Sequence, residues 1–380
     1  MRDLKLYEIC SLSEMEEIRE PWNRLVLSMP DATPFQTWEW NFTMTKLEKN
    51  NVRLRLIVAE DDLCQVVGIA PFWKRSTGIP GMMATEFIAG RNADYLDWLV
   101  LPPHEDVFVQ HLMKWIDQHS EYRIVHLQGL RKDSVDLISR YGSVEVRPFN
   151  ICLYARLPHT LAEYEKELMQ KRLRQAIRHD NRVLGNEGRL LFSISRTASE
   201  LKANLPVLFD LHQRRQRANG ERGRFYDKRR REAFQEMSLG LSQHGLPRLG
   251  ILRIDGKPAA SLYNLRLLDR EYGYLGGMDP TLAKYRPGNL LEHWMIGEAI
   301  KDGMQAYDLL GGNQSHKLRW TNETCETYQV LWTRWKVLSR VWWAREAIRA
   351  LIYRSQWIKW IYLATFGRFQ RSFRGRENAS

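Results

Sequence analysis

Two periodicities of apolar and polar positions, that of helices and that of strands, recur along the chain. Apolar residues three and four apart over residues 290–300 predict a helix, which ends near Lys301 and Gly303. The segments on either side of this helix, 271–277 and 306–310, have the short apolar or alternating pattern of strands. A strand, a loop, a helix and a second strand in this order are typical of an α/β protein.

The same order of elements occurs twice. The first half predicts two helices, a hairpin that turns at Asp61-Asp62 and a strand–helix–strand unit, over residues 14–27, 37–50, 54–74 and 95–129. The second half predicts the same elements, with a hairpin that turns at Asp255-Gly256, over residues 198–211, 228–245, 248–267 and 271–311. We therefore expect an α/β fold with a mixed sheet in two tandem domains, residues 1–155 and 156–330, followed by a helical tail over 331–380.

Composition narrows the classes of partner. The chain of 380 residues has a net charge of +12 at pH 7, which favours an anionic partner such as phosphate groups, nucleic acid or an acidic membrane surface. No apolar run approaches the roughly 18 residues of a membrane span, and the N-terminus lacks the pattern of a secretory signal. The four cysteines lie far apart and match no metal-ligand spacing. We expect a cytoplasmic protein with reduced thiols and no metal.

The loop before the helix at 290–300 is a candidate phosphate site. It reads Arg286-Pro287-Gly288-Asn289, which supplies a cation, a fixed φ, a residue without a side chain and a possible N-cap. The first N–H groups of a helix are unpaired and the helix dipole adds positive potential there, so Arg286, Gly288 and Asn289 can bind an anionic ligand. The alternative is an ordinary connection in which Gly and Pro only turn the chain.

Basic segments lie near this loop and at the C-terminus. Lys171, Arg174, Arg178 and Arg182 share one helix face, and a second basic run follows over 214–231. Either run can line a channel for an anionic ligand or form a solvated surface.

The tail is basic and aromatic. Residues 331–376 carry eleven Lys or Arg and six Trp against the single acid Glu346, and a helix is expected from about Lys336. Trp and Arg together suit an anionic membrane surface, whereas the alternative is a helix packed on the domain.

Short motifs in a fixed order resemble a known family. They are Thr33–Trp38 (TPFQTW), Ala93–Asp97 (ADYLD), Leu211–Arg215 (LHQRR), Tyr285–Leu291 (YRPGNLL) and Tyr307–Gly312 (YDLLGG), followed by Lys317 and Trp320. Over about residues 10–325, the chain resembles the GNAT-type acyltransferases of polysaccharide and cellulose biosynthesis, which are relatives of the Fem-type aminoacyl transferases built from paired GNAT-like halves. The usual GNAT acyl-carrier loop is absent, and Arg286-Pro287-Gly288 is at best a reduced counterpart.

The resemblance implies an N- or O-acyltransferase that uses acetyl-CoA or another acyl-CoA. It implies a polysaccharide or lipid-linked glycan precursor as acceptor, and either a free cytoplasmic location or a peripheral one on the inner face of the membrane. Two alternatives stay open: a Fem-like transferase that uses aminoacyl-tRNA, and a non-catalytic, membrane-associated assembly factor. Binding to other nucleic acids is not expected, because the chain has no recognisable RNA- or DNA-binding motif.

Acyl transfer needs a base for the acceptor and a proton donor for the leaving group. Asp308 ends a strand, where side chains of an α/β sheet face the ligand, and is the leading candidate base. His212 is the second candidate, because it titrates near neutrality. Tyr272 and Tyr274, on one strand face, could protonate the leaving group, and Lys317 could pair with a phosphate. The alternatives are a turn cap for Asp308, a partly buried helix residue for His212 and packing for the tyrosines.

Overall fold

The computed structural model describes residues 4–48, 50–77, 82–90, 92–119, 121–185, 189–312, 316–321 and 323–354. Within these ranges no helix combines the length and the apolar character that spanning a membrane requires.

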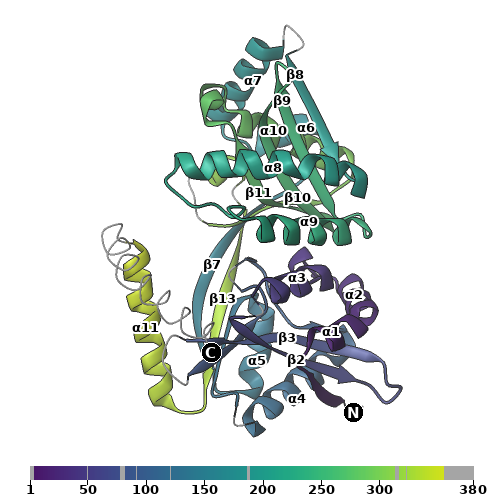
Figure 1. The fold of residues 1–380 in the computed structure, drawn as a ribbon, viewed down its shortest axis with the longest axis vertical. Coiled ribbons are helices and arrows are strands. Elements are labelled where there is room, and N and C mark those ends of the chain that lie inside the picture. Colours follow the sequence, from purple (N-terminus) through teal and green to yellow (C-terminus); the bar gives the residue numbers. More distant parts are fainter. Residues whose placement is uncertain are drawn as a thin grey trace, which may run out of the picture.

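One mixed sheet runs through the whole molecule (Figure 1). Its strands in the first half are β1 (Lys5–Ile9), β2 (Val52–Glu60), β3 (Val66–Ser76), β4 (Met83–Phe87), β5 (Leu99–Val100), β6 (Ile124–Leu130) and β7 (Glu145–Arg156). Those in the second half are β8 (Leu190–Ser195), β9 (Pro247–Ile254), β10 (Lys257–Leu267), β11 (Arg270–Met278), β12 (Ala306–Gly311) and β13 (Glu323–Thr333). Their spatial order is β1-β2-β3-β4-β6-β13-β7-β12-β11-β10-β9-β8, with β5 paired to β3. Among the described strands, β4–β6 and β11–β12 are parallel pairs and the others are antiparallel.

The long strands β7 and β13 join the two halves. They pair antiparallel with each other, and Figure 1 shows them running from one lobe to the other. The C-terminal part of β13 pairs with β6 of the first half, whereas the C-terminal part of β7 pairs with β12 of the second half. Each half therefore completes its sheet with a strand from the other half, and the two lobes share one hydrogen-bonded framework.

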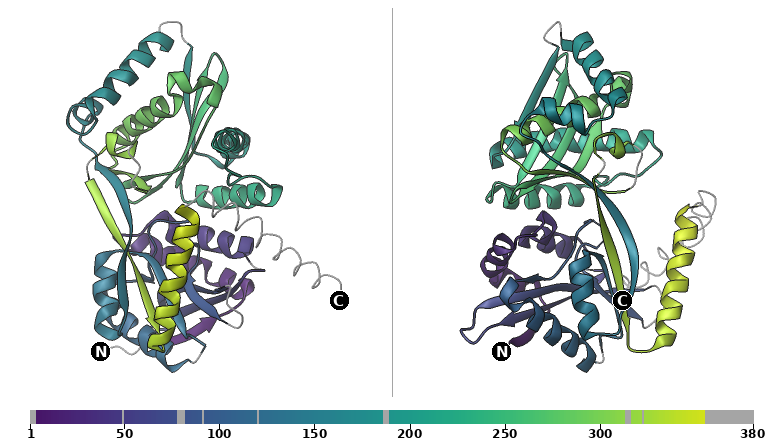
Figure 2. Two further views of the ribbon diagram at one scale, coloured as in Figure 1. Left: turned by 90° about the vertical axis from the view of Figure 1, so that its left-hand side faces the viewer. Right: turned by 180° about the vertical axis from the view of Figure 1, so that it is seen from behind.

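Helices cover both lobes. The first lobe has α1 (Leu12–Glu17), α2 (Arg19–Ser28), α3 (Trp38–Glu48), α4 (Glu105–Gln118) and α5 (Lys132–Tyr141). The second has α6 (Leu161–Glu167), α7 (Lys171–Gly185), α8 (Ala198–Ala218), α9 (Lys228–Ser242) and α10 (Pro287–Lys301). The last described helix is α11 (Lys336–Arg354), which lies beside the β7–β13 ribbon (Figure 2). Short 3₁₀ turns are η1 (Pro34–Gln36), η2 (Pro102–His104), η3 (Pro280–Tyr285) and η4 (Lys317–Arg319).

Apolar side chains bury the contact between the lobes. One core cluster reaches from the first sheet into α8, α9 and β9, and Phe35 of the first lobe contacts the rings of Tyr272 and Tyr274 on β11. Lys46 of α3 also pairs with Glu236 of α9 at 2.7 Å. The lobes are therefore packed against each other as well as joined by strands.

The mixed α/β class and both hairpins predicted from the sequence are confirmed. The helix predicted from residue 290 begins three residues earlier, at Pro287. The strand predicted over 95–100 is wrong except for β5, and α5 and β7 were not predicted. The tail predicted from residue 331 begins inside β13, which runs to Thr333, and residues 355–380 lie outside the described part. The domain limits at 155/156 and 330/331 stay predictions, and they fall within β7 and β13.

Candidate functional site

The sheet opens between β11 and β12. These parallel neighbours pair over three residues only, 270–272 with 306–308. β11 also carries a bulge at Tyr274, because two consecutive residues of β10 face β11 residues that lie two apart. A bulge bends a strand and increases its twist. The end of β11 therefore diverges from β12, and a cavity of about 370 Å³ lies between this end, the start of α10 and the segment around η4.

The cavity has a strand wall, a helix wall and a basic rim. Gly276, Gly277 and Met278 of β11 form the first wall, and Gly288, Asn289 and Glu292 of α10 form the second. Four cationic or titratable side chains complete it, namely those of Arg215, Arg286, His316 and Arg319. Among the described residues, no carboxylate forms an ion pair with Arg215 or Arg319.

The start of α10 has the character of an anion site. Arg286, at the N-cap, is left-handed with φ 47°, and its carbonyl accepts the Asn289 and Leu290 N–H groups at 2.9 and 3.2 Å. Pro287 has no N–H, and within the described part of the chain the Gly288 N–H has no acceptor. No atom lies within 4 Å of the place where a Gly288 Cβ would be, and the first turn contains no acid. An anion can therefore approach this N-terminus.

The Arg286 guanidinium already has a partner. It binds the buried Asp180 carboxylate of α7 through two hydrogen bonds of 2.6 and 2.8 Å, while 43% of its side chain stays exposed. Arg286 thus fastens α7 to the start of α10, and much of its charge is compensated. Arg215 and Arg319 are the cations left for an anionic ligand.

Glu292 is the acid of this cavity. Its carboxylate accepts a 2.6 Å hydrogen bond from the Tyr307 hydroxyl, which in turn accepts one from Asn264 at 2.9 Å. The Asn264 amide also donates to Glu271, and Glu271 pairs with Arg266. Burial raises the pKa of Glu292 to about 7, although the hydrogen bond from Tyr307 opposes this shift. A carboxyl with such a pKa can take and release a proton near neutral pH.

Asp308, predicted as the leading base, is fully buried and does not line this cavity. Its carboxylate accepts hydrogen bonds from the Tyr95 hydroxyl at 2.9 Å, from Arg270 at 3.0 Å and from the Leu310 N–H at 2.8 Å. Burial raises the pKa of Asp308, and the charge of Arg270 lowers it. These contacts hold the end of β12 in place, and the catalytic role of Asp308 stays a prediction.

His212 supports the strand wall from α8. Its Nε2 accepts the Arg224 N–H at 3.4 Å, so Nδ1 donates to the Gly276 carbonyl at 3.1 Å. Burial lowers the pKa of His212, in keeping with a neutral ring. A Cβ on Gly277 would lie 2.4 Å from the backbone nitrogen of His212, so only glycine allows α8 to pack this closely on β11. The structure places His212 behind the wall, and its role as a base stays a prediction.

The other predicted residues lie around the cavity rather than in it. Tyr272 and Tyr274 pack on Phe35 at the contact between the lobes, and burial raises the pKa of Tyr272. The Tyr274 hydroxyl donates to the Asn92 carbonyl at 3.2 Å. Lys317 donates to the Gly311 carbonyl at 2.6 Å, and burial lowers its pKa while Asp94 and Glu292 raise it.

Of the predicted residues, the structure therefore brings only Arg286, Gly288 and Asn289 together at the cavity. Sequence reasoning missed Glu292, His316 and Arg319, and it placed Arg215 only in a basic run. One usable signal was Glu292 near the start of the largely apolar segment 290–300.

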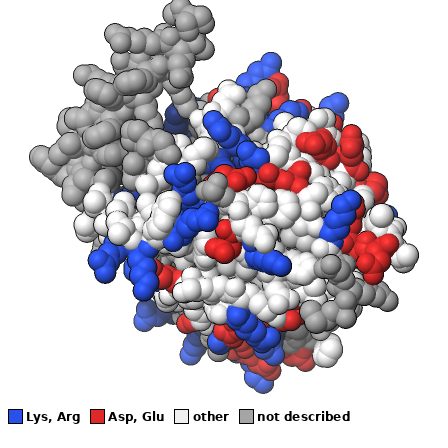
Figure 3. Space-filling model, turned by 90° about the horizontal axis from the view of Figure 1, so that it is seen from below, with Lys and Arg blue, Asp and Glu red and all other residues white. Residues whose placement is uncertain are grey.

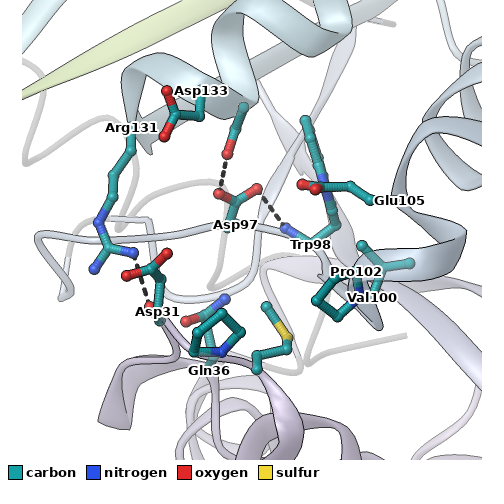
Figure 4. Close-up of a pocket in the computed structure, with 12 residues that line it drawn as sticks. Asp31, Gln36, Asp97, Trp98, Val100, Pro102, Glu105, Arg131 and Asp133 are labelled. Atoms are coloured by element: carbon teal, nitrogen blue, oxygen red, sulfur yellow. Dashed lines mark hydrogen bonds between the residues drawn. The ribbon is translucent and has the colours of Figure 1, made fainter. Parts of the chain in front are cut away.

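The first lobe has a related opening, which its own chain partly fills. The parallel strands β4 and β6 pair only at Thr85 and Val125. Residues 94–98 occupy the space beyond, where the Leu96 N–H donates to the Gly129 carbonyl at 3.1 Å. A cavity of about 260 Å³ remains beside Glu86 of β4 and His126 of β6. A smaller cavity of about 170 Å³ lies near the start of α4 (Figure 4). It is lined by one cation, Arg131, and by the acids Asp31, Asp97, Glu105 and Asp133.

A comparison with protein-family models matches part of the second lobe. Residues 171–318, from α7 into η4, match the family model described as "Acetyltransferase (GNAT) domain". This segment, which holds nearly the whole cavity, is thus of the GNAT acyltransferase type. No protein with a curated description matches the sequence.

Solved structures resemble the whole chain. A crystal structure of FemX has a TM-score of 0.63 at 11% identity, covering 89% of this chain and 99% of that one. The C-terminal domain of a putative lysylphosphatidylglycerol synthetase from Agrobacterium fabrum has a TM-score of 0.57 at 10% identity, covering 89% and 97%. The structure of L-PGS from Bacillus licheniformis has a TM-score of 0.51 at 11% identity, covering 82% and 96%. At these identities the likeness establishes the fold alone.

Proposed function

We propose that the protein transfers an acyl group from an acyl-CoA, with acetyl-CoA the first candidate, and that the donor binds in the cavity of the second lobe. The observation that supports this most is the open cavity itself. It combines a helix whose first turn has no acid, two cations that pair with no carboxylate among the described residues, and a carboxyl whose pKa is raised to about 7. The match to an acetyltransferase domain covers the same segment.

Each wall suits one part of such a donor. The donor diphosphate would bind at the Gly288 N–H and Asn289, with Arg215 and Arg319 close by and Arg286 at the rim. The amide-containing arm would lie along residues 276–278, where β11 no longer pairs with β12. Lys317, next to the rim residue His316, is our candidate for a further phosphate contact.

Glu292 is our candidate base. The amine or hydroxyl of the acceptor attacks the carbonyl carbon of the acyl group, and its proton passes to the Glu292 carboxylate. The thiolate of CoA then leaves and takes up a proton. Tyr307 holds Glu292 in position through their 2.6 Å hydrogen bond. Asp308 and His212 are the other candidate bases, and Tyr272 and Tyr274 are the candidate donors to the leaving group.

The acceptor we propose is a polysaccharide or a lipid-linked glycan precursor. A location at the inner face of a membrane would bring such a precursor within reach. A second candidate function is aminoacyl transfer from tRNA, which the similarity to FemX over 99% of its length favours. The basic rim would suit the phosphates of a tRNA end as well as those of CoA.

Binding of acetyl-CoA measured by calorimetry tests the proposal. Gly288→Val places a side chain where the ligand must approach the backbone, and we expect at least a tenfold loss of affinity, about 1.4 kcal/mol. Gly185→Val is the matched control, because a Cβ at Gly185 also meets no atom within 4 Å, yet it lies at the end of α7 outside the cavity lining. Equal binding by the parent and both variants would place the donor elsewhere. Binding of aminoacyl-tRNA in place of acetyl-CoA, lost in Gly288→Val, would favour the second candidate.

A further inference from the structure

One face of α11 is fixed to the first lobe. Trp342 is 2% exposed and packs against the ring of His126, with 5.0 Å between centroids. The Trp343 indole donates to Glu145 at 2.7 Å, and Ser339 also bonds to Glu145. These contacts come from one side of the helix and hold it along the β7–β13 ribbon (Figure 2).

The opposite face of α11 is apolar and exposed. Val337, Val341, Ile348 and Leu351 are 68%, 41%, 58% and 63% exposed, and Ala344 between them is exposed as well. These residues follow one another at intervals of four, three, four and three, which places them in one row along the helix. We call this row the α11 stripe. It extends over roughly 21 Å at 1.5 Å per residue.

Exposed large apolar side chains are concentrated in and next to α11. Thirteen large apolar side chains are exposed in the described part of the chain, and five of them lie in the 17 residues from Trp335 to Leu351. Single exposed apolar residues are normal on a protein surface, whereas a continuous exposed row indicates an interaction site.

Cations border the stripe. Lys336 and Arg340 are exposed beside it, and Glu346 is the only acid of α11, where it is paired with Arg345 and Arg349 on the packed side. Seen from below, Lys and Arg side chains gather on the left part of the surface in Figure 3, the side on which α11 lies in Figure 1. The surface therefore combines an apolar row with an excess of positive charge.

We propose that the α11 stripe docks onto an anionic lipid bilayer surface. A helix that lies in the membrane interface buries an apolar face, and cations beside that face meet acidic headgroups. The site is separate from the cavity of the second lobe and does not depend on the function proposed for it. The sequence beyond α11 adds Trp357, Trp360 and five further Lys or Arg, which suit the same surface.

A second copy of this chain suits the stripe less well. The intervals are those of a coiled-coil seam, with Val341 and Ile348 at positions that favour two parallel strands. In such a pair Arg340 of one copy would lie opposite Arg345 of the other, and the two like charges would repel. The seam also spans only two heptads, which is short for a stable pair of helices.

Cosedimentation of the full chain with vesicles tests the proposal. Vesicles of phosphatidylglycerol and phosphatidylcholine should bind the parent, and pure phosphatidylcholine vesicles should bind it much more weakly. Ile348→Gln with Leu351→Gln should lower the affinity for anionic vesicles about tenfold, because two apolar side chains no longer enter the interface. The matched control is Leu63→Gln with Leu191→Gln, since these leucines are 78% and 58% exposed outside α11, and it should bind like the parent.

Charge variants and folding controls complete the test. Lys336→Glu with Arg340→Glu should weaken binding to anionic vesicles at low salt, and the binding that remains should depend less on salt concentration than that of the parent. All variants should keep the melting temperature and the acetyl-CoA affinity of the parent, which separates this proposal from that of the second-lobe site. Absence of binding by the parent, or equal binding by the stripe variant, overturns the proposal. A dimer in solution that Ile348→Gln dissociates, without vesicle binding, would also overturn it and assign the stripe to contact between copies.

Discussion

In both lobes a helix connects the two strands of a parallel pair, but the space between the strands differs. In the first lobe, residues 94–98 enter the opening between β4 and β6, and a cavity of about 260 Å³ remains beside these strands. In the second lobe, a larger cavity of about 370 Å³ lies beside the end of β11 that no longer pairs with β12. The same architecture thus has a cavity with a basic rim in the second lobe, whereas four acids and one cation line the cavity of about 170 Å³ in the first lobe.

The helix that follows each opening differs in charge. The first turn of α4 contains Glu105 and Asp106, whose carboxylates satisfy the positive end of the helix dipole and repel anions. The first turn of α10 contains no acid. This difference alone predicts that an anionic donor binds the second lobe and avoids the first.

The segment that enters the first opening also supports the second lobe. Tyr95 donates to Asp308 at 2.9 Å. Asp94 accepts the Gly311 N–H and a 3.1 Å hydrogen bond from Asn150. Residues 93–97 and 307–312, two of the sequence motifs that carry the family resemblance, therefore contact each other across the lobes. The first lobe acts as a support for β12.

The largest expected effect is on the acyl-transfer rate, and it should distinguish Glu292 of the second lobe from Asp97 of the first. Glu292→Gln should lower the acyl-transfer rate about 10²–10⁴-fold, because a positioned base is removed. The rate of the parent should rise with pH up to about 7, where Glu292 becomes ionised, and this rise should disappear in the variant. Asp97→Asn is the matched change in the first lobe, where burial raises the pKa of Asp97 to about 7. Its turnover should stay within a few-fold of the parent, and an equal loss in both variants would contradict the division between lobes.

A glycine substitution should break the support between the lobes. A Cβ on Gly311 would lie 2.0 Å from the Asn150 amide nitrogen and 2.2 Å from an Asp94 carboxylate oxygen. Gly311→Ala should therefore lower the free energy of unfolding by about 1–3 kcal/mol, as overpacking does. Gly288→Ala is the control, because its Cβ would enter open space, and it should unfold like the parent. Denaturant titration of the three proteins measures the difference. A free energy of unfolding equal to that of the parent in Gly311→Ala would show that Asn150 and Asp94 move aside without loss of stability.

The pH dependence of stability should be similar in the two lobes. A carboxyl whose pKa is raised in the folded protein holds its proton more tightly there than in the unfolded chain. Stability is therefore lost as pH rises from the unfolded pKa of roughly 4 to the folded pKa near 7. Glu292→Gln and Asp97→Asn each remove one such loss. Between pH 5 and pH 8, the free energy of unfolding of each variant should therefore rise by about 1–2 kcal/mol relative to that of the parent, after allowance for solvent screening of these partly exposed groups. Thermal melts across this pH range give the comparison. A parent that becomes more stable relative to the variants as pH rises would contradict the predicted direction of the pH dependence.

The smallest effect concerns single cations. Arg319→Ala should weaken acetyl-CoA binding about fivefold to tenfold, roughly 1 kcal/mol, since one charged contact to phosphate is lost. Arg131→Ala removes the cation of the first-lobe cavity, where its guanidinium donates to the Asp31 carbonyl at 2.7 Å (Figure 4). That variant should bind acetyl-CoA like the parent. Calorimetry at low salt resolves the difference, and the reverse order of the two affinities would assign the donor to the first lobe.

Local signals predicted much of this structure. Apolar spacing identified α10, and the polar turns at Asp61-Asp62 and Asp255-Gly256 identified both hairpins. Gly288 was recognised because a residue without a side chain before a helix leaves the N-terminus open. These features depend on neighbours in the sequence.

Features that depend on distant parts of the chain could not be predicted in the same way. The exchange of β7 and β13 rests on strand pairing between the halves, which no local pattern specifies. The contacts of Asp308 with Tyr95 and Arg270 also join residues far apart in the sequence, so no local pattern could predict them. Glu292 looked like an ordinary polar position of a helix until the structure placed it beside Tyr307 and the cavity.

A crystal structure of the chain with bound CoA tests the central claim most directly. The account predicts CoA between β11 and α10, with the diphosphate at the Gly288 N–H, an arm along residues 276–278 and no CoA in the cavity lined by Asp97 and Glu105. CoA bound at the start of α4, or bound in the second lobe away from Gly288 and Glu292, would contradict it.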